Sequence, residues 1–239
     1  MSDPWEAHAE WWQRRFTDGV DPEYTEQILP LIAEHLPATG RMLDVGCGEG
    51  QVARVAAEQG LEVVGVDPSH TQVLLARERA SGPSYLQGSA TGLGVGDESV
   101  DVVVACLVFE HIADVDAALA EVVRVLRPGG RFLFLLNHPL LQTPGSGWID
   151  DQILDPPEQY WRIGPYLTEA DTIEEVERDV FIRFFHRPLN RYLNTAFDAG
   201  MSLVRMEEPA PPPGFLARAE EYADAASVPR LLFLRFEKR

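Results

Sequence analysis

The stretch Leu43-Asp44-Val45-Gly46-Cys47-Gly48-Glu49-Gly50 decides the fold of this chain. It follows a short apolar run and precedes a segment with helical spacing, so it predicts a tight turn from a strand into a helix. Glycines at alternate positions let the backbone approach a ligand closely. A dinucleotide-binding fingerprint would place Gly or Ala three positions after its second glycine, but Gln51 stands there. The stretch therefore indicates a different nucleotide-type loop, or a tight turn without a ligand.

Alternating strands and helices continue outward from this loop. Short apolar runs predict strands at 41–45, 62–66, 84–87, 100–106 and 131–137. Helical periodicity predicts helices at 51–59, 71–80 and 116–126, with an earlier one within 22–36. Further on, a helix at 189–199 precedes strands at 203–207 and 231–236. The pattern predicts an α/β fold with a doubly wound, mostly parallel seven-stranded sheet.

The bulk composition limits the domain organisation and the partners. A chain of 239 residues fits one domain, spanning 1–239, in which 1–40 forms a helical lid and 139–187 an inserted substrate cap with a strand near 180–185. A formal charge of −18 argues against nucleic-acid partners, since these require basic side chains. No apolar run suits a membrane span or signal peptide, so we expect a cytoplasmic protein. The oligomeric state stays open.

A second loop carries the carboxylate of Asp67. It lies in Gly65-Val66-Asp67-Pro68-Ser69, at the end of the second predicted strand. A carboxylate there can accept hydrogen bonds from both hydroxyls of a ribose. Alternatively, Asp67 only caps the next helix, because Asp is a favourable cap.

Later segments complete a resemblance to a known family. Residues 97–104 with 109–112, and 125–132 with its Arg127-Pro128-Gly129-Gly130 turn, follow the two loops in the order typical of class I S-adenosylmethionine-dependent methyltransferases. The resemblance covers 41–137 and implies S-adenosylmethionine as the cofactor, with Asp44 organising the glycine loop. One departure concerns adenine, because Ser89 stands where the family usually has an acidic residue. The implied cofactor residues are Asp44, Gly46, Cys47, Gly48, Gly50, Asp67, Pro68, Ser89, Ala90, Cys106, Leu107 and His111.

The two cysteines admit two interpretations. Cys47 and Cys106 fall at or just beyond the ends of the first and fourth strands, which the family topology makes neighbours. They either line the cofactor cleft as small buried residues or become joined by oxidation and block it. Neither has the spacing of a metal site, and we predict none.

Substrate recognition is assigned to the lid and the cap. Trp12, Tyr160, Trp161 and Tyr166 are the candidate substrate residues, and nearby arginines at 162, 183 and 187 favour an apolar or aromatic molecule with an acidic group, unless they are solvated or paired. His138 follows the fifth strand and is the candidate general base, or else a turn residue before Pro139. His186 is the second catalytic candidate, or a packing residue.

The predicted function is methyl transfer from S-adenosylmethionine to an oxygen, nitrogen or carbon atom of a small molecule. Two alternatives remain. A NAD-dependent oxidoreductase could share the fold, although Gln51 disfavours it. A regulatory protein could keep the cofactor site without catalysis.

Overall fold

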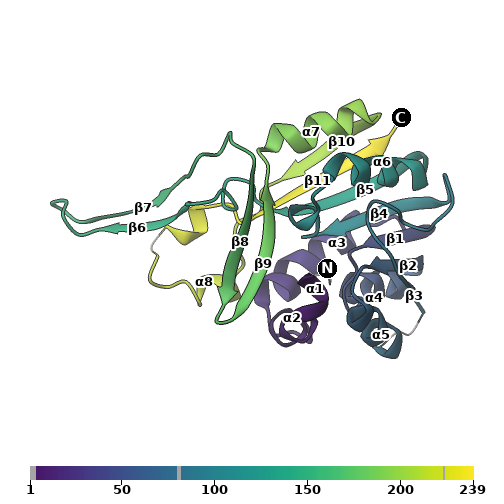
Figure 1. The fold of residues 1–239 in the computed structure, drawn as a ribbon, viewed down its shortest axis with the longest axis horizontal. Helices are drawn as coiled ribbons and strands as arrows, with labels where there is room; N and C mark the ends of the chain where they lie inside the picture. The colour runs from purple at the N-terminus through teal and green to yellow at the C-terminus, as the bar shows by residue number, and fades with distance from the viewer. Residues whose placement is uncertain (1–3, 80–81, 223) are drawn as a thin grey trace.

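A seven-stranded sheet forms the centre of the computed structural model, which describes residues 4–79, 82–222 and 224–239 (Figure 1). The strand order is β10-β11-β5-β4-β1-β2-β3, in which β11 is antiparallel to both neighbours. The strands are β1 (Arg41–Val45), β2 (Glu62–Asp67), β3 (Ser84–Gln87), β4 (Val100–Cys106), β5 (Leu126–Asn137), β10 (Met201–Glu207) and β11 (Leu231–Lys238). The predicted doubly wound α/β fold is confirmed.

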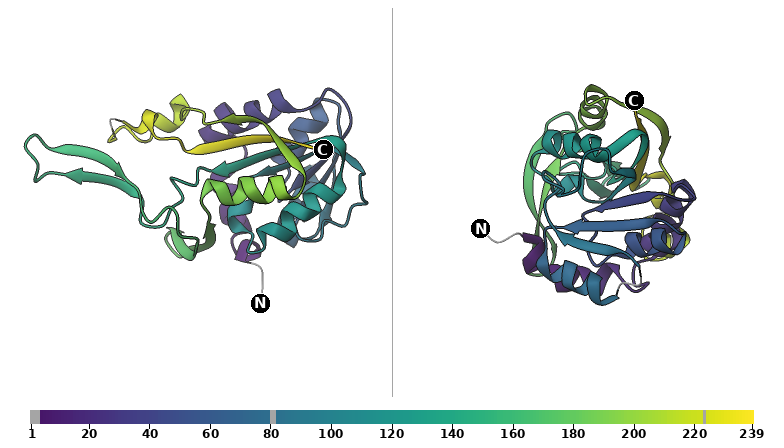
Figure 2. Two further views of the ribbon diagram at one scale, coloured as in Figure 1. Left: turned by 90° about the horizontal axis from the view of Figure 1, so that it is seen from above. Right: turned by 90° about the vertical axis from the view of Figure 1, so that its right-hand side faces the viewer.

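Helices cover both faces of the sheet (Figure 2). On one face, α6 (Val115–Val125) and α7 (Leu189–Asp198) pack through residues such as Leu119 and Tyr192 against a fully apolar sheet surface. On the other, α4 (Gln51–Glu58), α5 (His70–Arg79) and α3 (Leu29–His35) enclose a second core. Burial on both faces explains why the central strands are near-continuous apolar runs.

Two local predictions need correction. The helix expected within 22–36 is a π-helical turn, η1 (Tyr24–Ile28), followed by α3. Pro30 has no N–H to donate to the carbonyl of Glu26, so the regular α-helical ladder cannot run through this turn. The residues expected to form a turn after α6 instead begin β5, where Val100 pairs with Leu126 and Val102 with Arg131 across an irregularity. Ala80, the last residue of a predicted helix, and the first three residues of the predicted lid lie outside the described residues.

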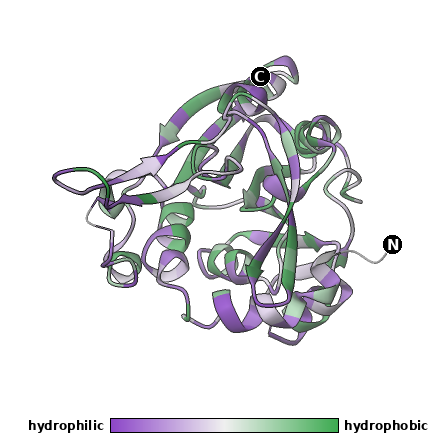
Figure 3. Ribbon diagram, turned by 60° about the vertical axis from the view of Figure 1, so that its left-hand side comes forward, coloured by the Kyte–Doolittle hydropathy of each residue, from purple (hydrophilic) through white to green (hydrophobic). Residues whose placement is uncertain are grey.

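The segment 139–187 forms two separate hairpins. The first, β6 (Gly147–Asp151) with β7 (Glu158–Arg162), projects away from the sheet (Figures 1 and 2). The second, β8 (Ala170–Glu177) with β9 (Val180–His186), runs beside α1 (Pro4–Ala7). Hydrophobic and hydrophilic residues are mixed along β8 and β9 (Figure 3), and burial rather than hydropathy alternates along most of β8 and the start of β9. One face of this hairpin therefore packs while the other meets water, including apolar residues such as Ile173 and Phe181.

Shorter elements complete the fold. They are α2 (Ala9–Phe16), η2 (Phe109–His111), α8 (Pro213–Leu216) and η3 (Ala225–Ser227). Within the described residues, no helix has both the length and the apolar character needed to cross a membrane.

Candidate functional site

A cavity of about 740 Å³ opens at the carboxyl ends of β1, β2 and β4. There β1 lies between β2 and β4, and the chain runs outward from β1 in both directions. Ligands of open α/β sheets bind at this kind of switch point. Ten of the twelve predicted cofactor residues line the cavity; Gly48 and Gly50 lie in the same loop but not on its wall.

The glycine loop is held by contacts that exclude larger side chains. Gly46, Gly48 and Gly50 have φ angles of +70°, +53° and +89°, which favour glycine. A Cβ atom on Gly46 would collide with Val108, and one on Gly50 would collide with the phenol of Tyr85. At Gly48 the nearest atom would be Trp12 Nε1, 4.0 Å away. Steric contacts therefore require glycine at positions 46 and 50, whereas at Gly48 only the backbone conformation favours it.

Asp67 connects the glycine loop to the start of α5. Its Oδ2 accepts a hydrogen bond of 2.8 Å from Gly48 N, and its Oδ1 accepts one of 2.8 Å from Ser69 N. The helix cap itself is Ser69, whose Oγ accepts from Gln72 N at 3.2 Å. Asp67 therefore does more than cap the helix, because it joins the glycine loop to the start of α5 at the wall of the cavity.

Asp44 is an acid with an unmet hydrogen-bonding capacity. It is 1% exposed, and no described residue donates to its Oδ2. Burial, together with the nearby charge of Asp67, raises its pKa to about 7. A buried acceptor without a donor is costly, so a cationic or donating ligand in the adjoining cavity would stabilise it.

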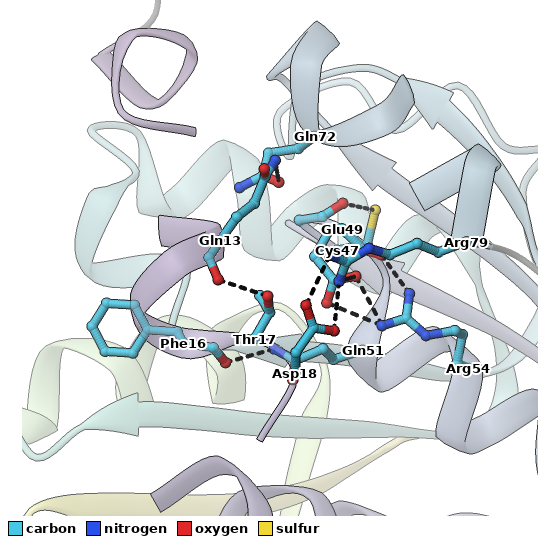
Figure 4. Close-up of polar contacts among 11 residues, drawn as sticks. Gln13, Phe16, Thr17, Asp18, Cys47, Glu49, Gln51, Arg54, Gln72 and Arg79 are labelled. Atoms are coloured by element: carbon cyan, nitrogen blue, oxygen red, sulfur yellow. Dashed lines mark hydrogen bonds and ion pairs between the residues drawn. The ribbon is translucent and has the colours of Figure 1, made fainter. Parts of the chain in front are cut away.

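Glu49 is a cavity residue that the sequence analysis did not single out. Its carboxylate is paired with Arg54 at 2.8 Å and with Arg79 at 2.9 Å, and Arg79 also contacts Asp18 (Figure 4). The only sequence signal was its place inside the glycine loop. The network joins α4, α5 and the segment after α2, and so stabilises one side of the cavity.

Aromatic residues from the amino-terminal helices close the cavity on another side. Trp5, Trp12 and Tyr24 line it, so the predicted substrate residue Trp12 lies at the cavity together with two aromatic residues that were not predicted. The ring of Trp12 stacks on Phe16 with centroids 4.3 Å apart. The carbonyl of Phe16 accepts a 2.9 Å hydrogen bond from Gln51 Nε2, which holds α2 beside the glycine loop (Figure 4).

The cap contributes differently from the prediction. Arg183 and Phe185 of β9 line the cavity, but the predicted substrate residues of the cap, Tyr160, Trp161 and Tyr166, do not. Tyr160 is exposed on the projecting β7, Trp161 lines a separate cavity of about 250 Å³, and Tyr166 accepts a hydrogen bond from Leu189 N through its hydroxyl. The hairpin β6–β7 turns away from the sheet, which explains why its aromatic residues miss the site.

Two of the three cap arginines already have partners. Arg183 pairs with Asp171 at 2.5 Å. Arg187 is buried and donates to the carbonyls of Phe109, Ile112 and Ala113 at 3.2, 2.7 and 2.8 Å. Arg162 is exposed on β7. The basis for an acidic group on the substrate is therefore weak.

The structure does not bring His138 or His186 to the cavity. His138 N donates to Arg230 O at 2.7 Å, which extends the pairing of β5 with β11. The ring consequently lies at that edge of the sheet, where Nε2 is 2.8 Å from Glu208 Oε1. His186 is buried, with its Nε2 2.8 Å from the carbonyl oxygen of Tyr166. Among the predicted histidines, His111 is the one that lines the cavity.

The remaining predicted residues lie along the wall as expected. Ser89 and Ala90 line the cavity with Thr91, whose hydroxyl is 3.0 Å from Ser89 Oγ. Cys47 and Cys106 line it as free cysteines, and burial raises the pKa of both thiols. This supports their interpretation as small residues of the cleft.

Comparison with known proteins agrees with this geometry. A family profile described as a methyltransferase domain matches residues 43–134. The chain is 34% identical over 150 residues to the ubiquinone biosynthesis O-methyltransferase of Sinorhizobium medicae, covering 55% of this chain and 60% of that protein. It is 37% identical over 124 residues to the malonyl-[acyl-carrier protein] O-methyltransferase of Serratia marcescens, covering 52% of this chain and 48% of the relative. The matches thus span about half the length of these relatives.

Among solved structures, the chain resembles an S-adenosylmethionine-dependent methyltransferase from Mesorhizobium loti. The TM-score is 0.76 at 26% identity, and the alignment covers 87% of this chain and 96% of the other. A second similar structure, from Listeria monocytogenes, has a TM-score of 0.76 at 24% identity, covering 88% of this chain and 96% of that chain. The likeness extends beyond the matched domain to most of the fold.

Proposed function

We propose that this chain is a class I S-adenosylmethionine-dependent methyltransferase that transfers a methyl group from S-adenosylmethionine to a small-molecule acceptor; the methyltransferase-domain match at residues 43–134 and the cavity at the strand ends support this. An oxygen acceptor is favoured because the two curated relatives are named O-methyltransferases. Nitrogen and carbon acceptors remain within the proposal. A cytoplasmic location is part of it, consistent with two free cysteines.

The observation that carries the proposal is the unpartnered Oδ2 of Asp44 beside the cavity. S-adenosylmethionine has a cationic amino-acid end that could donate to this oxygen. Asp67 lies at the end of the neighbouring strand β2 and presents a second carboxylate to the same cavity. Carboxylates can accept hydrogen bonds from ribose hydroxyls as well as from the two backbone N–H groups already bound. The described residues therefore fit the cofactor.

The residues of the chain mainly position the reactants. S-adenosylmethionine supplies a methyl group that is already activated on a sulfonium sulfur. Asp44 and Asp67 would hold its two polar ends, and Ser89 lies near where adenine recognition is expected. Trp5, Trp12 and Phe185 line the cavity, and their aromatic rings would exclude water from the bound acceptor. Alignment of donor and acceptor can contribute roughly 7 to 11 kcal/mol toward lowering a barrier.

Calorimetric titration tests the proposal directly. We expect S-adenosylmethionine to bind and NAD not to bind, because the glycine loop lacks the pyrophosphate fingerprint. Tight binding of NAD alone would replace the proposal with the oxidoreductase alternative. Incubation with methyl-labelled cofactor and small-molecule extracts then tests transfer. Binding without transfer to any extract would favour the regulatory alternative.

A further inference from the structure

The ring of His111 lies where the amino-terminal helices and the cap meet the wall of the cavity. It follows β4 in η2 and lines the cavity together with Trp5 and Arg183. Trp5 packs against it edge to face with centroids 4.7 Å apart, and Phe184 of β9 packs on it at 4.7 Å. Aromatic contacts from the amino-terminal helices and from the cap therefore fix the plane of this imidazole.

One hydrogen bond determines which nitrogen of His111 carries its proton. Nδ1 lies 2.9 Å from the carbonyl oxygen of Arg183. A carbonyl oxygen only accepts hydrogen bonds, so Nδ1 must donate and hold the hydrogen. In the neutral ring Nε2 is then an unprotonated acceptor.

The Nε2 atom is open to a ligand. No hydrogen bond from a described residue reaches it, and it is not among the fully buried polar atoms that lack a partner. His111 lines the cavity, and Nε2 is not the nitrogen bound by the Arg183 carbonyl, so this lone pair is the one left for a ligand in the cavity. Burial lowers the pKa of the ring to about 4, so the imidazole is neutral at physiological pH.

We propose that His111 Nε2 binds the hydrogen of the acceptor group and takes that proton during transfer, so that the enzyme selects hydroxyl or N–H acceptors over carboxylates. The inference rests on the proposed function and assigns His111 to the acceptor rather than to the cofactor. A carboxylate would place its own lone pairs against that of Nε2 and find no donor there. An O–H or N–H group meets the lone pair with its hydrogen.

The proton and electron balance is simple. The acceptor oxygen or nitrogen forms a bond to the methyl carbon, and the sulfur–methyl bond breaks with its electron pair remaining on sulfur. As the bond to the methyl carbon forms, the acceptor atom becomes positively charged and its hydrogen becomes acidic, so this hydrogen passes to Nε2 although the pKa of the free ring is about 4. The product is an imidazolium whose Nδ1–H still donates to Arg183 O. Release of that proton to water restores the neutral ring.

The first test is spectroscopic and needs no substrate. Long-range nitrogen–proton NMR correlation of the nitrogen-labelled free protein, with the His111 signals assigned by their loss in His111→Gln, distinguishes the two neutral tautomers. We expect the Nδ1–H form. An Nε2–H ring would overturn the proposal, since that nitrogen could not accept a proton.

The second test uses two matched variants. His111→Asn keeps a short amide that can donate to Arg183 O but lacks an acceptor at the Nε2 position, whereas His111→Gln places an amide oxygen near that position. With the hydroxyl acceptor found in the labelling screen, we expect kcat to fall about 10² to 10⁴-fold in His111→Asn, with partial recovery in His111→Gln. Cofactor affinity by calorimetry should be unchanged in both. His70→Asn, an exposed histidine at the start of α5, is the control. Equal kcat in wild type and His111→Asn would overturn the proposal.

The third test examines the products. Methyl esters are hydrolysed by mild alkali, whereas methyl ethers and methylamines are stable. Labelled products from extracts should be at least tenfold enriched in the stable class, and predominance of esters would overturn the selection of O–H or N–H groups. Absence of any transfer or of cofactor binding would count against the proposed function instead, because the NMR result judges His111 independently.

Discussion

Asp44 and Asp67, at the carboxyl ends of β1 and β2, are the residues proposed to bind the cofactor. Asp67→Ala should weaken S-adenosylmethionine binding by more than about tenfold, because a hydrogen bond to a charged group contributes roughly 1.5 to 3 kcal/mol. Loss of the bond to Gly48 N would also loosen the glycine loop. Calorimetry measures the affinity, with Asp198→Ala on the exposed end of α7 as the control. Unchanged affinity in the folded variant would contradict a cofactor role for Asp67.

Asp44 should make cofactor binding depend on pH near neutrality. Its pKa is about 7 in the free protein, and a cationic ligand favours the ionised form. Affinity should therefore fall as the pH is lowered below 7, by up to about tenfold per pH unit, and binding should release protons. Titrations in buffers of different ionisation enthalpy measure that release. A pH-independent affinity in wild type, equal to that of Asp44→Asn, would contradict this assignment.

The same acid should affect the stability of the free protein with the opposite dependence on pH. Because Asp44 and Glu110 both have a pKa raised to about 7 by burial, the native state retains protons that the unfolded chain loses above pH 4 to 5. Both residues consequently make stability fall as the pH rises toward 7. Asp44→Asn should remove only its own share of this dependence.

His138, the predicted general base, contacts Glu208 and Leu140 instead of the cavity, so we expect it to stabilise the fold. His138→Ala should reduce the free energy of unfolding by roughly 1 to 3 kcal/mol, because it leaves Leu140 N without its side-chain acceptor and removes the bond to Glu208. We expect kcat and cofactor affinity to change little, since the ring does not line the cavity. Denaturant unfolding and steady-state kinetics check both parts. A fall in kcat of about 10² or more at unchanged stability would restore the general-base hypothesis.

At the scale of elements, Glu177 connects the amino-terminal helix α2 to the cap. Its Oε2 accepts from Trp11 Nε1 and from Arg15 Nε, each at 2.7 Å. Glu177→Ala should let both elements open more often, so amide hydrogen exchange should accelerate in α2 and in the β8–β9 turn. Glu158→Ala on β7 is the matched control. Identical exchange in Glu177→Ala and wild type would show that this contact does not hold the two elements together.

At the scale of the whole molecule, the two hairpins of the insertion can be separated experimentally. Deletion of 147–162 with Ser146 joined to Ile163 should be possible, because Ser146 Oγ already accepts from Gly164 N at 2.9 Å. Cofactor affinity should stay near the wild-type value, since no residue of β6 or β7 lines the cavity. Calorimetry tests this, and the thermal midpoint reports whether the residues packed on Trp148 and Trp161 loosen. Weakened cofactor binding would show that the projecting hairpin supports the cavity.

The amino-acid sequence alone determined the sheet and the two loops that line the cavity at the ends of β1 and β2. Apolar runs gave accurate bounds for β1 and β4, because these central strands are buried on both faces and have little tolerance for polar residues. The bounds of the edge strand β3 were also predicted correctly, although only Tyr85 is buried in it. Asp44, the glycines and Asp67 could be placed because their spacing is local, within single strand-to-helix turns. Local backbone geometry is encoded by neighbouring residues.

Only the tertiary structure decided the acceptor side. Trp5, His111 and Phe185 come from three distant segments, and no short spacing relates them. The hairpin β6–β7 projects away from the sheet, so Tyr160 and Trp161 lie outside the cavity. The pairing of β5 with β11 places His138 outside it as well. The hydrogen bond from His111 to Arg183 O, 72 residues later in the chain, fixes a tautomer that sequence cannot specify. Long-range packing sets these contacts, and it depends on how whole elements fit together.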